Sequence, residues 1–274
     1  MSLLFARYSE SVVAKVKAFQ EAGGLVVGDE ELCPAIRPDV VVPRYQRTKN
    51  ASADKAALQE RAAKLRADLG DGYDWRLASD NPEVVTRRRV WGSSDYVFAV
   101  NDRREAGTYV GNYGMVMEDG LPSETTLTLR RRGGHVYDLT RQREVPATER
   151  GEDHMRVSLE LGPAEGRILL VADRPVERVA IDVPATVSPG ESIVVEVAVT
   201  DSQGAAVDAV IPLEVSVADP EGNPAEGSGF YGAAEGKLDL RLDLAPNDRS
   251  GMWEIRAREG ATGRESRAYF RVSE

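Results

Sequence analysis

The sequence predicts a mainly β protein, in which two consecutive antiparallel β-sandwiches follow a small α/β segment. Three observations lead to this fold class. From about residue 81 onward, short apolar runs recur with turn residues between them, as in sandwich proteins. Glycine and proline together number 39 of the 274 residues, and aromatic residues make up only 6%. Helical spacing of apolar residues is confined to the first 75 residues.

Residues 1–76 are expected to form the α/β segment. One helix is predicted between Ser9, which can cap it, and Gly23, which can end it. A second helix is predicted over 53–69. Short apolar strands are expected at 25–27 and 40–42. So few elements cannot cover both faces of a doubly wound sheet, so we interpret the segment as a fragment of a larger α/β domain or as a small cap.

Residues 77–175 are predicted to form the first sandwich. A hairpin signal comes from an apolar run that reaches Val90, the turn residues Gly92 and Ser93, and a second apolar run from Tyr96. The strands expected in this region are 84–90, 96–100, 108–117, 125–130, 135–139, 155–161 and 167–171.

Residues 176–274 are predicted to form a second, immunoglobulin-like β-sandwich. Leu213, Val215 and Val217 alternate with polar residues, and this period of two is typical of half-buried strands. Trp253 is expected in the core. The strands expected here are 179–183, 193–200, 211–218, 238–244, 252–258 and 268–272.

The charge pattern excludes two classes of partner. The net charge is −10, and the residues from Val176 onward hold 18 acidic and nine basic side chains, which gives −9. An acidic surface argues against nucleic acid and anionic membranes, because both attract basic faces. No apolar run approaches the length of a membrane span, so no membrane insertion is expected. Residues 1–5 do not resemble a signal peptide.

Few side chains are suited to catalysis. The chain has one cysteine, Cys33, and two histidines, His135 and His154, which stand far apart in the sequence. Cys/His zinc sites and nucleophile–base pairs need several such residues close together. We therefore expect no catalytic residue and no cofactor.

One turn carries a candidate calcium site. Asp219, Glu221 and Asn223 alternate along it, and Ca²⁺ prefers oxygen ligands of this kind. The alternative interpretation is ordinary turn chemistry, since Asp, Asn, Pro and Gly are also the usual turn residues.

A mixture of aromatic and polar residues suggests carbohydrate contact. Sugar rings stack on aromatic faces, while amides and carboxylates bind their hydroxyl groups. The same aromatics can instead fill the core or make domain contacts. The candidate contact residues are Trp75, Trp91, Tyr109, Tyr113, Asn101 and Asp102.

Two stretches resemble a known family. The helix–Gly-Gly–strand pattern of Lys17–Val27 resembles the glutamine-amidotransferase-like domain of β-galactosidase-type bacterial glycoside hydrolases, which serves assembly. Tyr96–Asp102, with Val136–Leu139 and Leu161–Pro163, is similar to the sandwich that follows such catalytic domains. The last hundred residues, which include Asp201–Gly204, look like an immunoglobulin or macroglobulin-type module.

The resemblance implies a non-catalytic accessory or assembly region of a larger carbohydrate-active protein. Its partners would be other domains of the same parent chain and, through the aromatic residues, a polysaccharide. A glycosidase barrel would need about 250 residues, which the chain does not offer. The alternatives are a structural or adhesive spacer of an envelope protein, and an independent enzyme. Oligomeric state stays open. Location would be extracellular or periplasmic if the parent is exported, and otherwise cytoplasmic.

Overall fold

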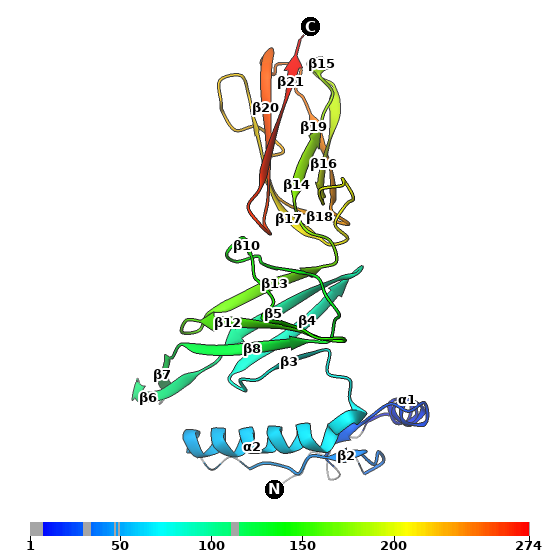
Figure 1. Ribbon diagram of the computed structural model, residues 1–274, viewed down its shortest axis with the longest axis vertical. Coiled ribbons are helices and arrows are strands. Elements are labelled where there is room, and N and C mark those ends of the chain that lie inside the picture. The colour runs from blue at the N-terminus through cyan, green and yellow to red at the C-terminus, as the bar shows by residue number, and fades with distance from the viewer. Residues whose placement is uncertain (1–7, 30–33, 47, 49, 111–114, 274) are drawn as a thin grey trace. The chain divides into compact units, whose positions relative to one another are not determined.

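A computed structural model describes residues 8–29, 34–46, 48, 50–110 and 115–273. The chain divides into two compact units, one of Met1–Trp75 with Ala106–Asp119 and one of Arg76–Glu105 with Gly120–Glu274. Strands dominate the larger unit, so the protein is mainly β, as predicted (Figure 1). Neither helix combines the length and the apolar character that a membrane span needs, as far as the described residues go.

The smaller unit contains the two predicted helices and two short strands. Asn50 caps the second helix, since its side-chain oxygen accepts a hydrogen bond from the Ala53 N–H at 3.1 Å. Gly23, with φ of +86°, follows the first helix, as expected. The elements are α1 (Glu10–Glu21), β1 (Val27–Gly28), β2 (Val40–Val41), α2 (Ala51–Leu69) and a 3₁₀ turn at Gly70–Gly72.

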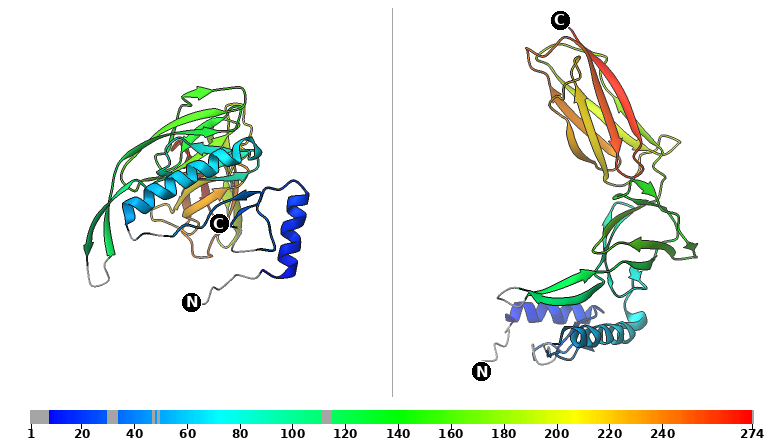
Figure 2. Two further views of the ribbon diagram at one scale, coloured as in Figure 1. Left: turned by 90° about the horizontal axis from the view of Figure 1, so that it is seen from below. Right: turned by 90° about the vertical axis from the view of Figure 1, so that its left-hand side faces the viewer.

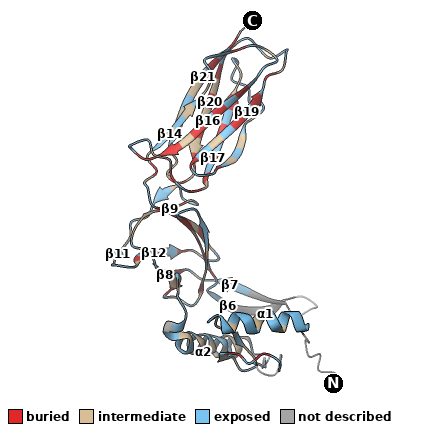
Figure 3. Cartoon of the chain, turned by 90° about the vertical axis from the view of Figure 1, so that its right-hand side faces the viewer, coloured by how far each residue is buried: buried red, intermediate tan, exposed pale blue. Residues whose placement is uncertain are grey.

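This unit buries little apolar surface. Strands β1 and β2 pair in parallel over two residues each. Helix α1 has no buried residue, and Phe19 on its apolar stripe is 54% exposed. Figure 3 shows both helices largely in the colours of exposed and intermediate residues. The interpretations as a fragment of a larger domain and as a small cap both stay predictions.

One predicted strand of the first sandwich is instead a separate hairpin. The run 108–117 was expected to be a single strand. The structure has β6 (Arg104–Val110) and β7 (Met115–Gly120), which pair with each other as a two-stranded sheet (Figure 2). Ala106–Asp119 belongs to the smaller unit. The sequence therefore correctly indicated β structure in this run. It did not show that the run contains two strands that pair with each other and not with the sandwich.

The first sandwich consists of two antiparallel sheets. Apolar side chains from both sheets alternate inward and form one core, which includes Val97, Leu127, Val157 and Leu169. One sheet has the order β10 (Arg143–Glu144), β9 (His135–Asp138), β13 (Gly166–Ala172), β5 (Ser94–Asn101), β4 (Val84–Trp91). The other has the order β11 (Glu149–Arg150), β12 (Met155–Leu161), β8 (Ser123–Leu129), β3 (Leu77–Ser79).

The second sandwich also consists of two sheets. A three-stranded sheet lies opposite a five-stranded sheet that brings the last, penultimate and central strands together. Strands β15 and β21 pair in parallel, and the other pairs are antiparallel. One sheet is β14 (Arg178–Asp182), β16 (Ser192–Thr200), β19 (Lys237–Asp243). The other is β15 (Thr186–Val187), β21 (Glu265–Val272), β20 (Gly251–Glu259), β17 (Ile211–Ala218), β18 (Gly229–Ala233).

The two sandwiches of the larger unit share buried residues. Tyr137, Leu170 and Ala172, from the first sandwich, belong to the core of the second and are at most 1% exposed. The Tyr137 hydroxyl accepts a hydrogen bond from the Val176 N–H at 2.8 Å, and burial is the main cause that raises the pKa of this tyrosine. The junction is thus a continuation of the core and not a solvated linker.

Candidate functional site

The predicted carbohydrate contacts belong to both units of the structure. Trp75 lies in the smaller unit, where its ring packs edge-on against Tyr73 at 4.7 Å and beneath the Arg66 guanidinium at 5.1 Å. Trp91 lies at the end of β4 in the larger unit and is 48% exposed. Tyr113 is outside the described residues.

The polar members of the predicted set have structural contacts. Asn101 is 3% exposed; its amide N–H groups donate to the Leu121 and Gly162 carbonyls, each at 2.7 Å. Its side-chain oxygen accepts bonds from the Arg103 N–H and the Ser123 hydroxyl. All four hydrogen-bonding positions are occupied, so Asn101 has none left for a sugar hydroxyl and is corrected to a structural residue.

Two members keep their place as predictions. Asp102 is exposed and lies 3.5 Å from the Arg104 guanidinium. Tyr109 belongs to β6, and its side chain is outside the described part of the structure. Together with Trp91, both stay predictions.

The candidate calcium ligands form hydrogen bonds within their turn and ion pairs with a neighbouring arginine. The Asp219 carboxylate accepts the N–H groups of Glu221 and Asn223 at 2.9 and 2.8 Å. The Asn223 side chain is the main cause that lowers the Asp219 pKa. Arg249 pairs with Glu221 and approaches Asp219 at 3.7 Å, so a cation is already supplied by the protein. These contacts favour the interpretation as turn chemistry.

The histidines lie in separate ion-pair clusters. His135 contacts Glu144 at 3.3 Å, while His154 lies between Asp153 at 3.0 Å and Glu149 at 3.4 Å. The Asp153 hydrogen bond, followed by that of Glu149, raises the pKa of His154. Among the described residues no three histidine, cysteine or carboxylate side chains are placed to hold a metal ion. Cys33 lies outside those residues.

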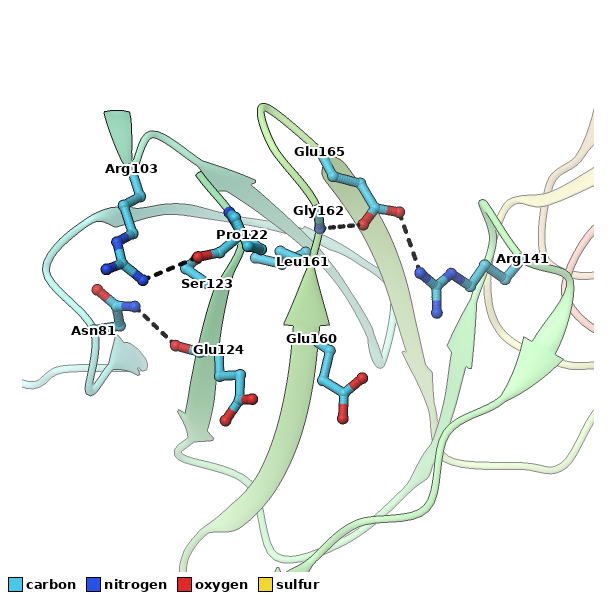
Figure 4. A pocket seen from close by; sticks show the side chains of 10 residues that line it. All are labelled: Asn81, Arg103, Pro122, Ser123, Glu124, Arg141, Glu160, Leu161, Gly162 and Glu165. Carbon is cyan, nitrogen blue, oxygen red and sulfur yellow. Dashed lines mark hydrogen bonds and ion pairs between the residues drawn. The ribbon is translucent and has the colours of Figure 1, made fainter. Parts of the chain in front are cut away.

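The structure reveals an open cleft that sequence analysis missed. It has a volume of about 710 Å³ and lies at one end of the first sandwich. Its wall is held by hydrogen bonds from Arg103 to the Pro122 carbonyl at 3.0 Å and from Asn81 to the Glu124 carbonyl at 2.8 Å (Figure 4). The residues that line it are Asn81, Arg103, Pro122, Ser123, Glu124, Arg141, Glu160, Leu161, Gly162 and Glu165.

Two carboxylates stand side by side in this cleft. Glu124 on β8 and Glu160 on β12 are direct register partners, and Figure 4 shows their side chains extending from adjacent strands. Neither makes a side-chain ion pair with another described residue. Period-two placement could have shown that both face outward, but the register that joins positions 36 apart in the chain is a tertiary property.

A third carboxylate of the cleft is tied into the fold. Glu165 accepts the Gly162 N–H at 2.7 Å and pairs with Arg141 at 3.3 Å and with Arg167 at 3.0 Å. Arg167 also contacts Asp138 at 2.6 Å, and both of those side chains are almost fully buried. These contacts hold Glu165 in the wall of the cleft.

The cleft presents side chains of both charges to solvent. Glu124 and Glu160 are both exposed. Together with Arg103 and Arg141 they form a mixed-charge surface that can hydrogen-bond hydroxyl or ammonium groups.

The larger unit of the protein is thus two joined β-sandwiches, and the cleft lies in the first of them.

The sequence matches no protein family model and no curated protein. Among solved structures, it is similar to the superoxide reductase (neelaredoxin) from Ignicoccus hospitalis, with 17% identity and a TM-score of 0.28, over 36% of this chain and 82% of that one.

Two longer solved structures are also similar. The Yersinia pseudotuberculosis adhesin InvE has 14% identity and a TM-score of 0.30, over 70% of this chain and 59% of that one. A protein assigned as a β-galactosidase from Bacteroides fragilis has 14% identity and a TM-score of 0.23, over 69% of this chain and 34% of that one. At such scores no property of these proteins transfers to this chain.

Proposed function

We propose that the chain is a non-catalytic accessory region of a larger protein, in which the two joined sandwiches serve as a rigid spacer between other domains. The observation that carries this proposal is the shared core at the junction. Leu170 and Tyr137 of the first sandwich are buried in the core of the second. A spacer that holds its neighbours at a set distance needs such a junction, since a solvated linker would permit domain motion.

Hydrogen bonds across the junction support the same function. The Tyr96 hydroxyl donates to the Val210 carbonyl at 2.8 Å and accepts the Val210 N–H at 2.6 Å. The Ser94 hydroxyl donates to the Asp208 carbonyl at 2.7 Å. Arg258 reaches back to the Gln142 side chain at 2.6 Å. These directional hydrogen bonds fix the orientation of one sandwich relative to the other, which apolar contacts alone would fix less strictly.

The parent protein is proposed from the sequence. The resemblance of Tyr96–Asp102 and Val136–Leu139 to sandwiches of β-galactosidase-type hydrolases favours a carbohydrate-active parent. Within that proposal, Trp91 is an exposed aromatic of the first sandwich that is available to glycan. A structural or adhesive spacer of an envelope protein is the alternative, and it uses the same rigid junction. The codons upstream of this segment distinguish the parents, since a barrel-sized coding region there would favour the hydrolase.

Distance measurements by pulsed electron paramagnetic resonance test the spacer. Ser158 and Ser216 are exposed, one in each sandwich, and can be changed to labelled cysteines in a Cys33→Ser background. A single narrow distance distribution is expected. Leu170→Ala should broaden it, whereas Leu127→Ala, which removes an equally buried leucine from the first core, should not. A broad distance distribution in the labelled protein without a core substitution would refute a rigid spacer.

Affinity electrophoresis tests the glycan contact separately. Retardation by a polysaccharide that is lost in Trp91→Ala and retained in Tyr269→Ala would support it, since Tyr269 is similarly exposed on the second sandwich. Failure of every polysaccharide to retard the protein would leave the spacer standing and remove the glycan contact.

A further inference from the structure

One face of the first sandwich is only half covered. On the outer side of the sheet that contains β4, β5, β13 and β9, the half near Tyr96, Tyr137 and Leu170 packs on the second sandwich. The other half continues the same apolar surface, and no described residue of the larger unit forms a layer over it. We call it the open half-face, and its residues are Val85, Arg87, Arg89, Phe98, Val100 and Ile168.

The apolar residues of the open half-face are aligned across strands. Val85 is the direct partner of Val100, and Phe98 is the partner of Ile168. Val85 is 58% exposed and Val100 is 45% exposed. Neighbouring valines of this exposure on a sheet face leave apolar area in water, which association with a second surface would remove.

The open half-face also carries positive charge without an internal counterion. Arg87 and Arg89 alternate with Val85 along β4, so their side chains leave the same face. Neither forms an ion pair with a described residue. Arg88, on the opposite face, pairs with Asp95 at 2.5 Å. A surface that fits the open half-face must therefore combine an apolar contact with carboxylates.

The second sandwich presents a surface with this chemistry. Asp182, Glu196 and Asp239 are direct cross-strand partners on β14, β16 and β19, so three carboxylates lie in one row. None of them forms an ion pair in the described structure. Like charges placed directly opposite destabilise a sheet. Lys237 and Arg241 flank Asp239 on the same face of β19, but neither forms an ion pair with the row in the described structure, and Arg241 pairs with Asp243 at 2.8 Å. Val194, two residues before Glu196, is 49% exposed.

We propose that the open half-face binds the acidic row of a second copy of this chain. The guanidinium groups of Arg87 and Arg89 would meet the carboxylates of Glu196 and Asp239, while Val194 would cover the exposed valines. The sheet face is suited to this partner because its other half already packs on a sandwich of the same kind. This self-association is independent of the spacer function.

Sedimentation velocity on the full chain tests the proposal. Reversible association is expected over a concentration series that reaches about 1 mM, and it should weaken when salt is raised from about 50 to 500 mM, because screened charges contribute less. The double variant Arg87→Glu with Arg89→Glu should raise the dissociation constant by about tenfold or more. Arg132→Glu with Arg271→Glu is the matched control, since both arginines are exposed elsewhere, and it should associate like the parent protein.

A charge-swap experiment makes the test specific. Glu196→Arg with Asp239→Arg should also weaken self-association by about tenfold or more. An equimolar mixture of this variant with the Arg87→Glu, Arg89→Glu variant should form a heterodimer, because each supplies the charge that the other lacks. A variant that had lost its fold could not form this heterodimer, so the mixture also controls for misfolding. The proposal would be overturned if the unsubstituted chain stays monomeric at low salt, or if it still associates after both charge reversals. It would also be overturned if the mixture of the two variants forms no heterodimer.

Discussion

Two tyrosine hydroxyls link the sandwiches at the scale of single residues. Tyr137 is 1% exposed and accepts the Val176 N–H, while Tyr96 both donates to and accepts from the backbone of Val210. Burial is the main cause that raises the pKa of both tyrosines, so both stay protonated and can act as hydrogen-bonding groups. A tyrosine suits such a junction because its ring adds apolar area while its hydroxyl satisfies a backbone group.

Removal of the Tyr137 hydroxyl should destabilise the larger unit. In Tyr137→Phe the N–H of Val176, which is 2% exposed, loses its acceptor, and a buried donor without a partner costs about 1–3 kcal/mol. Urea denaturation measures the change. Tyr269→Phe is the control, because its hydroxyl bonds Glu254 at an exposed position and should change stability by less than about 0.5 kcal/mol. Equal effects of the two substitutions would contradict the role of Tyr137.

His154 should titrate above its ordinary pKa of 6.5. Hydrogen bonds to Asp153 and Glu149 favour the charged imidazole in the folded chain. The stabilisation is therefore fully present below the unfolded pKa and is lost as pH rises through the folded value. An NMR titration should show Asp153→Asn and Glu149→Gln lowering the pKa by more than Glu152→Gln, which changes a neighbouring exposed carboxylate. A pKa of 6.5 or less in the parent protein would contradict this expectation.

At the scale of secondary-structure elements, a tight turn in the second sandwich connects a strand of one sheet to a strand of the other. Glu235 and Gly236 both have positive φ, 53° and 72°, and Ala234 pairs with Lys237 across them. This is the geometry of a two-residue hairpin turn that matches the twist of adjacent strands. The turn joins β18 of one sheet to β19 of the other. Its conformation therefore affects how the two sheets close over their core.

Gly236→Ala should be much more costly than Gly204→Ala. A Cβ at Gly236 would lie 2.7 Å from the Val207 carbonyl oxygen and 2.8 Å from that of Val199, which are backbone atoms that cannot move aside cheaply. Gly204 has a similar φ of +82° but open space around it. We expect a loss of about 2–4 kcal/mol at Gly236 and about 1 kcal/mol at Gly204, measured by chemical denaturation. Similar losses would show that backbone conformation alone decides both positions.

The larger unit should unfold as one body at the scale of the whole molecule. Its junction buries Leu170 and Ala172 of the first sandwich in the core of the second. Opening either sandwich would expose that surface, so the free energies of the two are coupled. This coupling is what a spacer requires, and it distinguishes the unit from two domains joined by a linker.

Coincident unfolding of both sandwiches is the expected outcome. Hydrogen exchange of backbone amides in β20, which contains the buried Trp253, reports on the second sandwich, and exchange of amides in β5 and β8 reports on the first. Leu170→Ala should lower the stability measured by both probes by about 2–5 kcal/mol. Two separate transitions in the parent protein, or an effect of Leu170→Ala on one probe alone, would contradict a shared core.

The sequence predicted the strands well where their side chains alternate. Leu213, Val215 and Val217 are buried, as the period of two indicates, and Trp253 is in the core. The predicted hairpin appears as β4 and β5 around Gly92, whose φ is +53°. These features depend on neighbours in the chain, so local patterns suffice to predict them.

The candidate sites were harder to predict because they depend on register and burial. Asn101 was expected at a sugar-binding surface, but its strand end is enclosed by the 121–123 and 162 turns. Glu124 and Glu160 were not singled out, because nothing near either residue signals that the other lies opposite. The same holds for the acidic row of Asp182, Glu196 and Asp239.

Alternation, turn residues and charge balance, read from the sequence alone, determined that this protein is mainly β and that its acidic charge lies in the C-terminal module. Those properties follow from side-chain type and spacing along the chain. The fused junction, the paired carboxylates of the cleft and the half-covered sheet face were decided only by tertiary structure. The reason is physical: each one depends on which strands become neighbours and how far each strand slides along its partner, and these are set by the packing of the whole core.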